Sequence, residues 1–408
     1  MKSARSWGRL GMKSEWYVST IDDVCLLVTD GAHNSPPSVE NGEYMASVKD
    51  FAEYGFDFST CKRISSEDYS KLEKQGCVPN IGDVLVGKDG ARYFEDIVIY
   101  KQPERPALLS SIAILRVNPE IITSEFLYYT LKSPAVKKDV RDNYGSGSAI
   151  PRIVLKDFKR MPIHYPSIED QRKITLIFEA IDAKIDLNNR INDNLEQQAQ
   201  AIFRQELLQN GELPPNWTTG SLLDIADYLN GLAMQKFRPV DDERGLPVLK
   251  IKELRQGFCD YSSELCSPNI KPEFIVHDGD VIFSWSGSLL VDLWCGGTCG
   301  LNQHLFKVTS VKYPKWFYYT WTAHHLARFV AIAADKATTM GHIKREDLAK
   351  AEVIIPDVAS MERIGGVLQP IYDLVINQRI ENRKLSMLRD SLLPKLMSGE
   401  LDVSAIEI

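Results

Sequence analysis

Few residues of the chain have the type and spacing of a chemical site. Cys295-Gly-Gly-Thr-Cys299 places two thiols at a separation compatible with a metal ion, and His304 is the nearest further donor. No second pair of ligands follows at metal spacing, so small buried or loop thiols are the alternative interpretation. The sequence also lacks the G-x-x-x-x-G-K-S/T, G-x-G-x-x-G and H-E-x-x-H motifs. We therefore predict no catalytic residue and no metal or cofactor on this chain, and a role in recognition or scaffolding.

Two polar loops carry the side chains best suited to bind phosphate. They are 143–152, Asn-Tyr-Gly-Ser-Gly-Ser-Ala-Ile-Pro-Arg, and 335–344, Asp-Lys-Ala-Thr-Thr-Met-Gly-His-Ile-Lys. Backbone N–H groups and hydroxyls in such loops can approach phosphates closely, although a solvated turn has the same composition. Aromatic-rich helical segments precede the loops at 125–131 and 314–321, and both contain Tyr-Tyr-Thr. Aromatic side chains at helical spacing are more often core than a platform for stacking bases, so we predict core.

Composition and charge narrow the class of protein. With 408 residues, 44% hydrophobic and 25% charged, the chain suits two or three folded domains. It shows no bilayer-spanning apolar stretch and no signal-peptide core, so we expect a cytoplasmic protein whose seven cysteines are reduced. The net charge is −7, but six of the seven excess negative charges lie in 166–217 and 356–408. The remaining blocks are close to neutral, so charge alone does not indicate DNA binding.

The chain contains an internal repeat at an offset of 190 residues. The match runs without a gap for roughly fifty residues and predicts a tandem of two units, each a mixed domain followed by a long helix. The matched pairs include Ile153 with Ile343, Asp157 with Asp347, Pro166 with Pro356, Ile174 with Ile364, Ile181 with Ile371, and Leu195 with Leu385.

Each unit ends in a segment with helical periodicity. From Glu169 to Gln209 no Gly or Pro occurs and apolar residues recur every three or four positions, and the segment from Ile364 repeats this pattern. Gly365-Gly366 and Pro370 predict a break or kink in the first turns of the second helix. About forty residues form a rod of roughly 60 Å, which needs a packing partner.

Both rods carry amides where the apolar pattern would place Ile or Leu. Asn188 and Asn192 match Gln378 and Asn382 across the repeat. Buried amides fix the pairing of helices because they are satisfied only opposite each other. We therefore predict an antiparallel coiled coil; the alternative is that these amides face solvent. The predicted seam is Ile174, Ile181, Asn188, Asn192, Leu195, Ile364, Ile371, Gln378, Asn382 and Leu385.

Short motifs mark the boundaries of both units. They are Pro166-Ser-Ile-Glu-Asp-Gln-Arg-Lys-Ile174, the openings Trp16 to Gly31 and Trp217 to Gly231, and the ending Ser391-Leu-Leu-Pro-Lys-Leu-Met-Ser-Gly-Glu-Leu401. Two globular blocks, each followed by a Pro-flanked strand and a long helix with these motifs, resemble the specificity subunit of type I restriction-modification systems over nearly the whole chain. The second helix departs from the pattern, because Met361-Glu-Arg-Ile stands where Gln-Arg-Lys-Ile is expected.

The resemblance implies an α+β fold. Two mixed α/β target recognition domains in tandem repeat, 1–165 and 213–355, would be separated by two long spacer helices, 166–212 and 356–408. Each domain would read one half of a bipartite DNA target, while the paired helices set the spacing and dock two modification (methyltransferase) subunits. S-adenosylmethionine would bind those partners, and motor-nuclease restriction subunits would complete the complex. This chain itself would be a non-catalytic specificity subunit.

Loop side chains are the predicted DNA contacts, because Lys and Arg bind phosphates while Ser, Thr, His and Arg also reach base edges. They are Lys88, Arg92, Ser146, Ser148, Arg152, Lys236, Arg238, Lys250, Lys252, Ser286, Lys336, Thr338, Thr339, His342 and Lys344. One alternative is a coiled-coil adaptor that binds only proteins, which predicts no salt-dependent affinity for DNA. Another is a metalloenzyme built around Cys295, Cys299 and His304, which predicts a stoichiometric metal.

Overall fold

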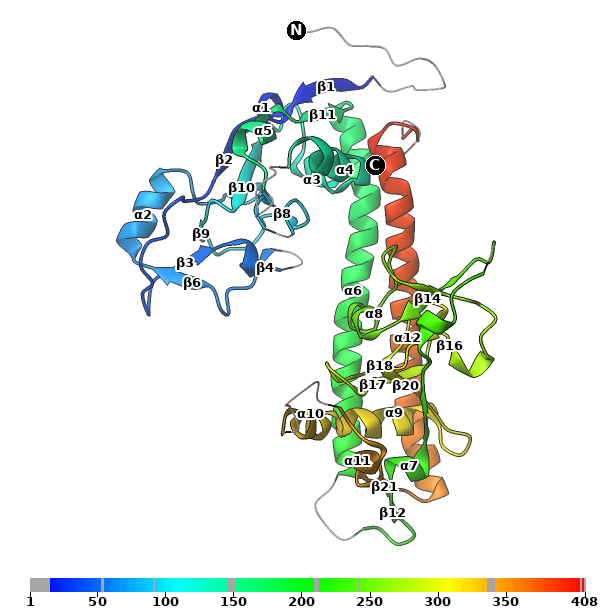
Figure 1. Ribbon diagram of the computed structural model, residues 1–408. Coiled ribbons are helices and arrows are strands. Elements are labelled where there is room, and N and C mark those ends of the chain that lie inside the picture. Colours follow the sequence, from blue (N-terminus) through cyan, green and yellow to red (C-terminus); the bar gives the residue numbers. More distant parts are fainter. Residues whose placement is uncertain are drawn as a thin grey trace. The chain divides into compact units, whose positions relative to one another are not determined.

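The chain folds into two compact units, each with a mixed domain and part of two long helices. The computed structural model describes residues 15–52, 55–90, 92–145, 152–208, 213–240, 242–335, 342–403 and 406. The first unit comprises 1–182 and 387–408, and the second comprises 183–386. Helices and strands mix in both (Figure 1), so the predicted tandem α+β fold is confirmed.

The first unit is built on a four-stranded sheet in the order β2-β10-β7-β8. A three-stranded sheet, β6-β3-β9, and the pairs β1-β11 and β4-β5 complete its strands. The strands are β1 (Tyr17–Thr20), β2 (Cys25–Asp30), β3 (Glu43–Ala46), β4 (Phe51–Ala52), β5 (Gly55–Phe56), β6 (Lys62–Ile64), β7 (Val84–Gly87), β8 (Ile97–Ile99), β9 (Ala107–Leu108), β10 (Ile112–Val117) and β11 (Pro162–Tyr165). The helices are α1 (Ile21–Val24), α2 (Ser66–Lys74), α3 (Ser124–Lys132), α4 (Pro134–Asn143) and α5 (Leu155–Arg160).

The second unit repeats this plan with the sheet order β13-β20-β17-β18 and the pair β12-β21. A smaller sheet has the order β15-β14-β19-β16. The strands are β12 (Thr218–Ser221), β13 (Asp227–Asn230), β14 (Leu246–Leu249), β15 (Leu265–Cys266), β16 (Ile275–Val276), β17 (Val281–Ser284), β18 (Leu290–Leu293), β19 (Cys299–Leu301), β20 (Leu305–Thr309) and β21 (Glu352–Ile355). The helices are α7 (Leu222–Ile225), α8 (Ile251–Gln256), α9 (Lys315–His324), α10 (Leu326–Asp335) and α11 (Arg345–Ala349).

The matched openings of the two units have matched local structure. In the first, the carboxylate of Asp23 accepts from the backbone N–H of Thr20 at 3.1 Å, which starts α1. In the second, Asp224 accepts from the N–H of Ser221 at 2.7 Å and starts α7. A Cβ added at Gly31 would lie 2.2 Å from the carbonyl oxygen of Leu108, and Gly231 meets an equivalent carbonyl at the same distance. Only glycine allows these close strand crossings.

Aromatic side chains of α3 and α9 lie in the cores of the two units. Phe126 is fully buried in the first, and Trp316, Phe317 and Trp321 are at most 2% exposed in the second. The prediction of core side chains rather than a base-stacking platform is therefore confirmed.

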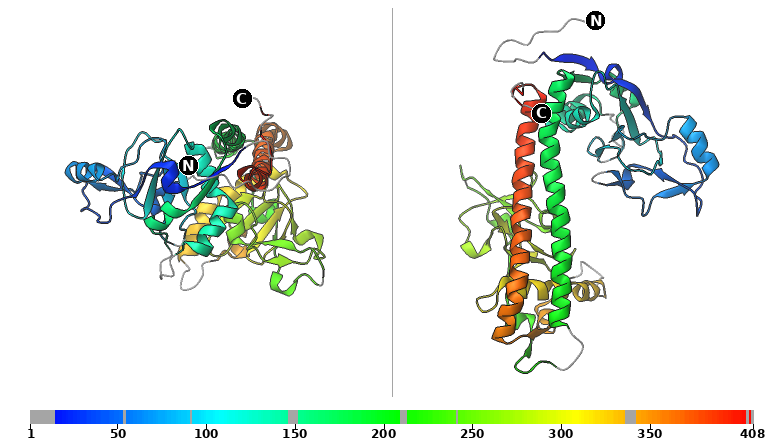
Figure 2. Two further views of the ribbon diagram at one scale, coloured as in Figure 1. Left: turned by 90° about the horizontal axis from the view of Figure 1, so that it is seen from above. Right: turned by 180° about the vertical axis from the view of Figure 1, so that it is seen from behind.

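The two long helices, α6 (Ile168–Leu207) and α12 (Val358–Met397), have 40 residues each and match across the repeat. Figure 2 follows both from two further sides. Of the break or kink predicted in α12, the break is wrong, because the helix is continuous through Gly365, Gly366 and Pro370. Packing explains why the helix continues. Trp316 of α9 lies against Gly365, and a Cβ added at Gly365 would be 2.7 Å from Nε1 of Trp316. Buried neighbours on the same helix face hold the turn despite the missing N–H of proline.

The long helices run antiparallel, as predicted. In the second unit, residues progressively closer to the end of α6 pair with residues progressively closer to the start of α12. In the first unit, Asp182 of α6 binds Arg389 of α12 at 2.8 Å. The pairs in the second unit are Lys184 with Glu381, Asn188 with Asn382, Glu196 with Arg379, and Glu206 with Arg363.

Two of the four seam amides are buried, and Gln378 and Asn382 are half-buried. Asn188 is 0% and Asn192 5% exposed, so the solvent-facing alternative is wrong for both. Asn188 Nδ2 donates to Asn382 Oδ1 at 2.8 Å, the predicted amide–amide contact. Among the described residues, the side-chain oxygens of Asn188, Asn192 and Gln378 are buried without a partner, so mutual satisfaction is incomplete. Of the apolar seam, Ile174, Ile181 and Ile364 are buried, and Leu195, Ile371 and Leu385 are half-buried.

Within the part of the chain that the structure describes, no helix combines the length and apolarity needed to cross a membrane.

Candidate nucleic-acid interface

In the first unit, the polar loop 143–152 ends at a hydrogen bond to Lys88, which directly follows strand β7 of the central sheet. The N–H of Ile153 donates to the carbonyl of Lys88 at 2.9 Å, and Asp89 and Arg152 form an antiparallel bridge. The loop therefore returns directly beside the carboxyl end of β7. Arg152 is exposed at this edge.

The second unit has the same backbone arrangement. The N–H of Ile343 donates to the carbonyl of Trp285 at 2.9 Å, and Ser286 forms an antiparallel bridge with His342. Because the hydrogen bond and the bridge recur, Lys88 corresponds to Trp285, Asp89 to Ser286, and Arg152 to His342.

We call this backbone arrangement the frame: Lys88, Asp89 and Arg152 in the first unit, and Trp285, Ser286 and His342 in the second. The side chains on the two frames differ in chemistry. In the first unit Lys88 is only 6% exposed, and its ammonium lies 3.3 Å from Asp30 and 3.7 Å from Asp89. In the second, Trp285 stacks on Phe306 with centroids 5.6 Å apart and donates from Nε1 to Asn230 at 3.0 Å. One frame thus presents a buried ion-paired cation, and the other an indole.

The structure places the remaining predicted contacts of the first unit as follows. Arg92 is exposed and binds Asp96 at 2.6 Å, a hydrogen bond that raises the pKa of the guanidinium. Lys88 joins the loop to the sheet, so its position suits holding the frame more than reaching a phosphate. Ser146 and Ser148 lie outside the described residues.

In the second unit, three of the basic residues predicted to contact DNA form ion pairs with acidic side chains. Lys250 and Arg238 both reach Glu264, at 2.7 and 3.6 Å, and Lys250 holds the pKa of that carboxyl below its ordinary value. Lys252 binds Asp260 at 3.2 Å. Each of these three cations remains at least 38% exposed, so a competing phosphate could reach it.

The other predicted residues of the second unit divide into two groups. Lys236, His342 and Lys344 are exposed, whereas Ser286 is 6% exposed and its hydroxyl lies 3.0 Å from His304 Nδ1. The residues outside the described part of the chain are Lys336, Thr338 and Thr339.

Sequence reasoning missed a cluster beside this frame. Asn230, Trp285 and His304 gather at the strand ends, and the indole of Trp285 lies 6.3 Å from the His342 ring. The available signal was Trp285-Ser-Gly-Ser, a polar turn with one large aromatic that directly follows a predicted strand.

Comparison with known proteins assigns the chain to a family. The family model for the type I restriction modification DNA specificity domain matches residues 13–197 and again 214–384. The chain belongs to the type I restriction-modification DNA specificity family. The two matches coincide with the two halves of the internal repeat.

Full-length relatives and a solved structure agree with this family. The MjaIX specificity subunit of Methanocaldococcus jannaschii is 26% identical, over 96% of this chain and 95% of that protein. The EcoDI specificity subunit of Escherichia coli is 25% identical, over 70% of this chain and 72% of its own length. The crystal structure of the S subunit from M. genitalium has a similar fold, with a TM-score of 0.59 at 13% identity, and the match covers 95% of this chain and 97% of that one.

In this member of the specificity family, the cysteine and histidine residues considered for a metal site have separate partners. His304 binds Ser286, Cys295 Sγ donates to the carbonyl of Leu293 at 3.5 Å, and Cys299 contacts another thiol. Among the described residues, no three His, Cys, Asp or Glu side chains gather to hold a metal ion. The structure therefore does not assemble the site that the metalloenzyme alternative requires.

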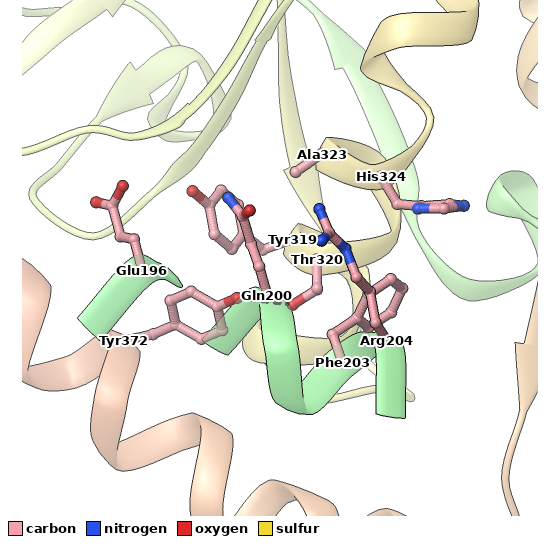
Figure 3. A pocket seen from close by; sticks show the side chains of 9 residues that line it. All are labelled: Glu196, Gln200, Phe203, Arg204, Tyr319, Thr320, Ala323, His324 and Tyr372. Atoms are coloured by element: carbon pink, nitrogen blue, oxygen red, sulfur yellow. Dashed lines mark hydrogen bonds between the residues drawn. The ribbon is translucent and has the colours of Figure 1, made fainter. Parts of the chain in front are cut away.

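The second unit also contains a cavity of about 230 Å³ between α6, α9 and α12. Figure 3 shows Glu196 at one end, and Arg204 with His324 at the other. Burial raises the pKa of Glu196, but its carboxylate is bound to Arg379 at 2.7 Å. Burial also lowers the pKa of His324. Glu196 is thus occupied by an ion pair that joins the two long helices, and we assign no chemistry to this cavity.

Proposed function

We propose that this chain is the DNA-recognition subunit of a type I restriction-modification complex. Each globular block reads one half of a bipartite target in double-stranded DNA. The paired helices set the distance between the half-sites and dock two modification subunits, which bind S-adenosylmethionine and methylate adenine. Motor-nuclease subunits complete the restricting complex. The chain contributes recognition and no catalysis.

The observation that carries this proposal is one backbone frame with two sets of side chains. Both units fix a polar loop beside the equivalent strand end. At the matched end of that loop, however, one unit exposes Arg152 and the other exposes His342. A shared frame with different edge chemistry suits two readers of different base sequences, because bases are distinguished by their hydrogen-bonding and apolar edges.

Exposed basic side chains of the second unit support contacts to phosphate. Lys250 and Lys252 are held by carboxylates yet remain exposed, so their positions are set before DNA arrives. Exchange of these carboxylates for phosphate would make binding depend strongly on salt.

The long helices support the spacer and docking roles. A helix of 40 residues is about 60 Å long, against roughly 34 Å for one turn of DNA. Both helices expose large apolar side chains, which solvent-facing helices seldom concentrate without a partner. In the first unit these are Leu176, Met387 and Leu388; in the second they are Leu187, Val358, Val367 and Leu374.

The test uses the full chain assembled with its modification subunits. DNA affinity is measured by fluorescence anisotropy over a salt series. Lys344→Gln alters an exposed residue beside the frame, and Lys312→Gln alters an exposed residue after β20, at the opposite end of the sheet. We expect a steep loss of affinity with salt, and a slope reduced by about one for Lys344→Gln only. Affinity that is absent or independent of salt would favour the protein-only adaptor.

A further inference from the structure

Two cysteines of the second unit bring their thiols together. Cys299 begins β19 and is 0% exposed, and Cys259 lies in the loop after α8 and is half-buried. Both pack in one small core with Leu254 and Trp294. Their side chains are in hydrogen-bonding contact, although they stand far apart in the sequence.

The environments of the two thiols differ. The hydrogen bond from Cys299 lowers the pKa of Cys259 despite its burial and the nearby carboxylates of Glu253 and Asp260; Ser263 also lowers it. Burial raises the pKa of Cys299, and contact with Cys259 raises it further. A thiolate is the nucleophilic form of cysteine, so Cys259 is the reactive member. It is also the one that solvent reaches.

The loop that carries Cys259 is anchored on both sides. It starts after Gly257, whose φ of 81° ends α8 in the left-handed region. Asp260 Oδ1 then accepts from the N–H of Ser262 at 2.8 Å, and the Ser263 hydroxyl donates to Glu253 at 3.1 Å. These contacts fix the chain on both sides of Cys259.

We propose that Cys259 and Cys299 form a peroxide-sensitive dithiol, in which Cys259 is oxidised first and Cys299 resolves it to a disulfide. The Cys259 thiolate attacks one oxygen of hydrogen peroxide; an S–O bond forms, the O–O bond breaks, and hydroxide leaves. Cys299 sulfur then attacks the sulfenic sulfur; an S–S bond forms, the S–O bond breaks, and the Cys299 proton joins the departing hydroxide as water. The thiolate's original proton neutralises the first hydroxide, so two thiols and one peroxide give a disulfide and two waters.

Cys266 is the competing partner that the structure disfavours. It is fully buried in β15, and burial raises the pKa of its thiol. Its Sγ packs against Gly300, where an added Cβ would lie 2.5 Å from the sulfur. We therefore assign Cys266 a packing role beside the dithiol.

The experiment treats the folded full chain with increasing hydrogen peroxide, quenches it with an alkylating reagent, and maps the cysteines by peptide mass spectrometry without reduction. We expect a Cys259–Cys299 linked peptide at the lowest peroxide concentration that modifies any cysteine, and its loss on treatment with dithiothreitol. Separate alkylation of Cys259 and Cys299 at that concentration would overturn the proposal. A Cys266–Cys299 linked peptide would overturn it equally.

Variants identify the order of the steps. With Cys299→Ser, Cys259 should accumulate as a sulfenic acid that dimedone traps; with Cys259→Ser, Cys299 should remain a thiol. Cys295→Ser is the matched control, because Cys295 is also a buried thiol of this unit and its substitution should leave the linked peptide unchanged. Dimedone labelling of Cys299 in Cys259→Ser would contradict the assigned order. The linked peptide in the unsubstituted chain decides the pairing even if a variant misfolds.

Discussion

Arginine side chains of α12 fix this helix to its neighbours through ion pairs. Arg383 binds Asp278 at 2.6 Å and also donates to the carbonyl of Cys295, while Arg379 binds Asp292 at 2.7 Å. The guanidinium of Arg383 lowers the pKa of Asp278 despite partial burial, and the N–H of Gly297 adds to the effect. These contacts tie the helix to the loop before β17, to β18 and to the residues just after β18, so they stabilise the position of the sheet that carries Trp285.

The Asp278 pair predicts a specific dependence of stability on pH. Because the folded state lowers the pKa of Asp278, its contribution is complete above the ordinary aspartate pKa of about 3.9 and is lost as pH falls below it. Asp278→Asn should lower the free energy of unfolding by about 1–3 kcal/mol at neutral pH. The difference from the unsubstituted chain should shrink on acidification.

Urea unfolding of the full chain at several pH values measures this difference. Glu362→Gln, at an exposed position of α12, is the control and should change stability little at any pH. A constant difference between Asp278→Asn and the unsubstituted chain down to acid pH would refute the role of the ion pair.

At the scale of elements, α12 shows how packing overrides a local sequence signal. Gly365, Gly366 and Pro370 predict a break or kink, yet the helix continues through all three. Trp316, which is only 1% exposed, fills the space over Gly365. Gly366 has no atom within 4 Å of an added Cβ. The two glycines therefore have different roles although they are adjacent.

Alanine at each glycine should have opposite effects. Gly366→Ala should stabilise the chain by up to about 1 kcal/mol, because alanine favours the helix. Gly365→Ala should destabilise it by about 1–3 kcal/mol, because the new methyl group must displace a rigid buried indole. Thermal unfolding of both variants gives the comparison. Equal stabilisation by both would show that the contact with Trp316 imposes no constraint.

The long helices predict a change in DNA spacing. One heptad added to each helix, at the level of Asn188 and Asn382, keeps the antiparallel pairing while lengthening both helices by about 10 Å, or roughly three base pairs. The methylated target should gain a longer gap with unchanged bases. Unchanged spacing in a complex that still methylates DNA would remove the ruler role.

At the scale of the whole molecule, periodic features were predictable from the sequence. The repeat placed α6 and α12 at matched positions, and the interrupted apolar pattern at Asn188 and Asn192 predicted a buried, antiparallel seam. Such features depend on local spacing, which sequence records directly. The target recognition domains were predicted from the family resemblance rather than from residue chemistry.

Contacts between distant segments could not be predicted. The burial of Lys88 depends on Asp30, a residue of a different strand, and the exposed edge at Trp285 depends on the return of the chain at His342. The contact of Cys259 with Cys299 likewise arises only when the loop after α8 packs against the core that contains Cys299. The tertiary fold sets all three, and no motif in the sequence encodes it.

The central claim is that one chain contains two independent DNA readers. It is tested most directly by mapping adenine methylation with long-read sequencing, in cells that contain the chain and its modification subunits. Loops 145–152 and 335–344 are replaced one at a time, and 310–313, at the opposite end of the second sheet, is the control. We expect a bipartite motif in which each loop replacement changes a different half and the control changes neither. Methylation without the chain, or a motif indifferent to both loops, would contradict the account.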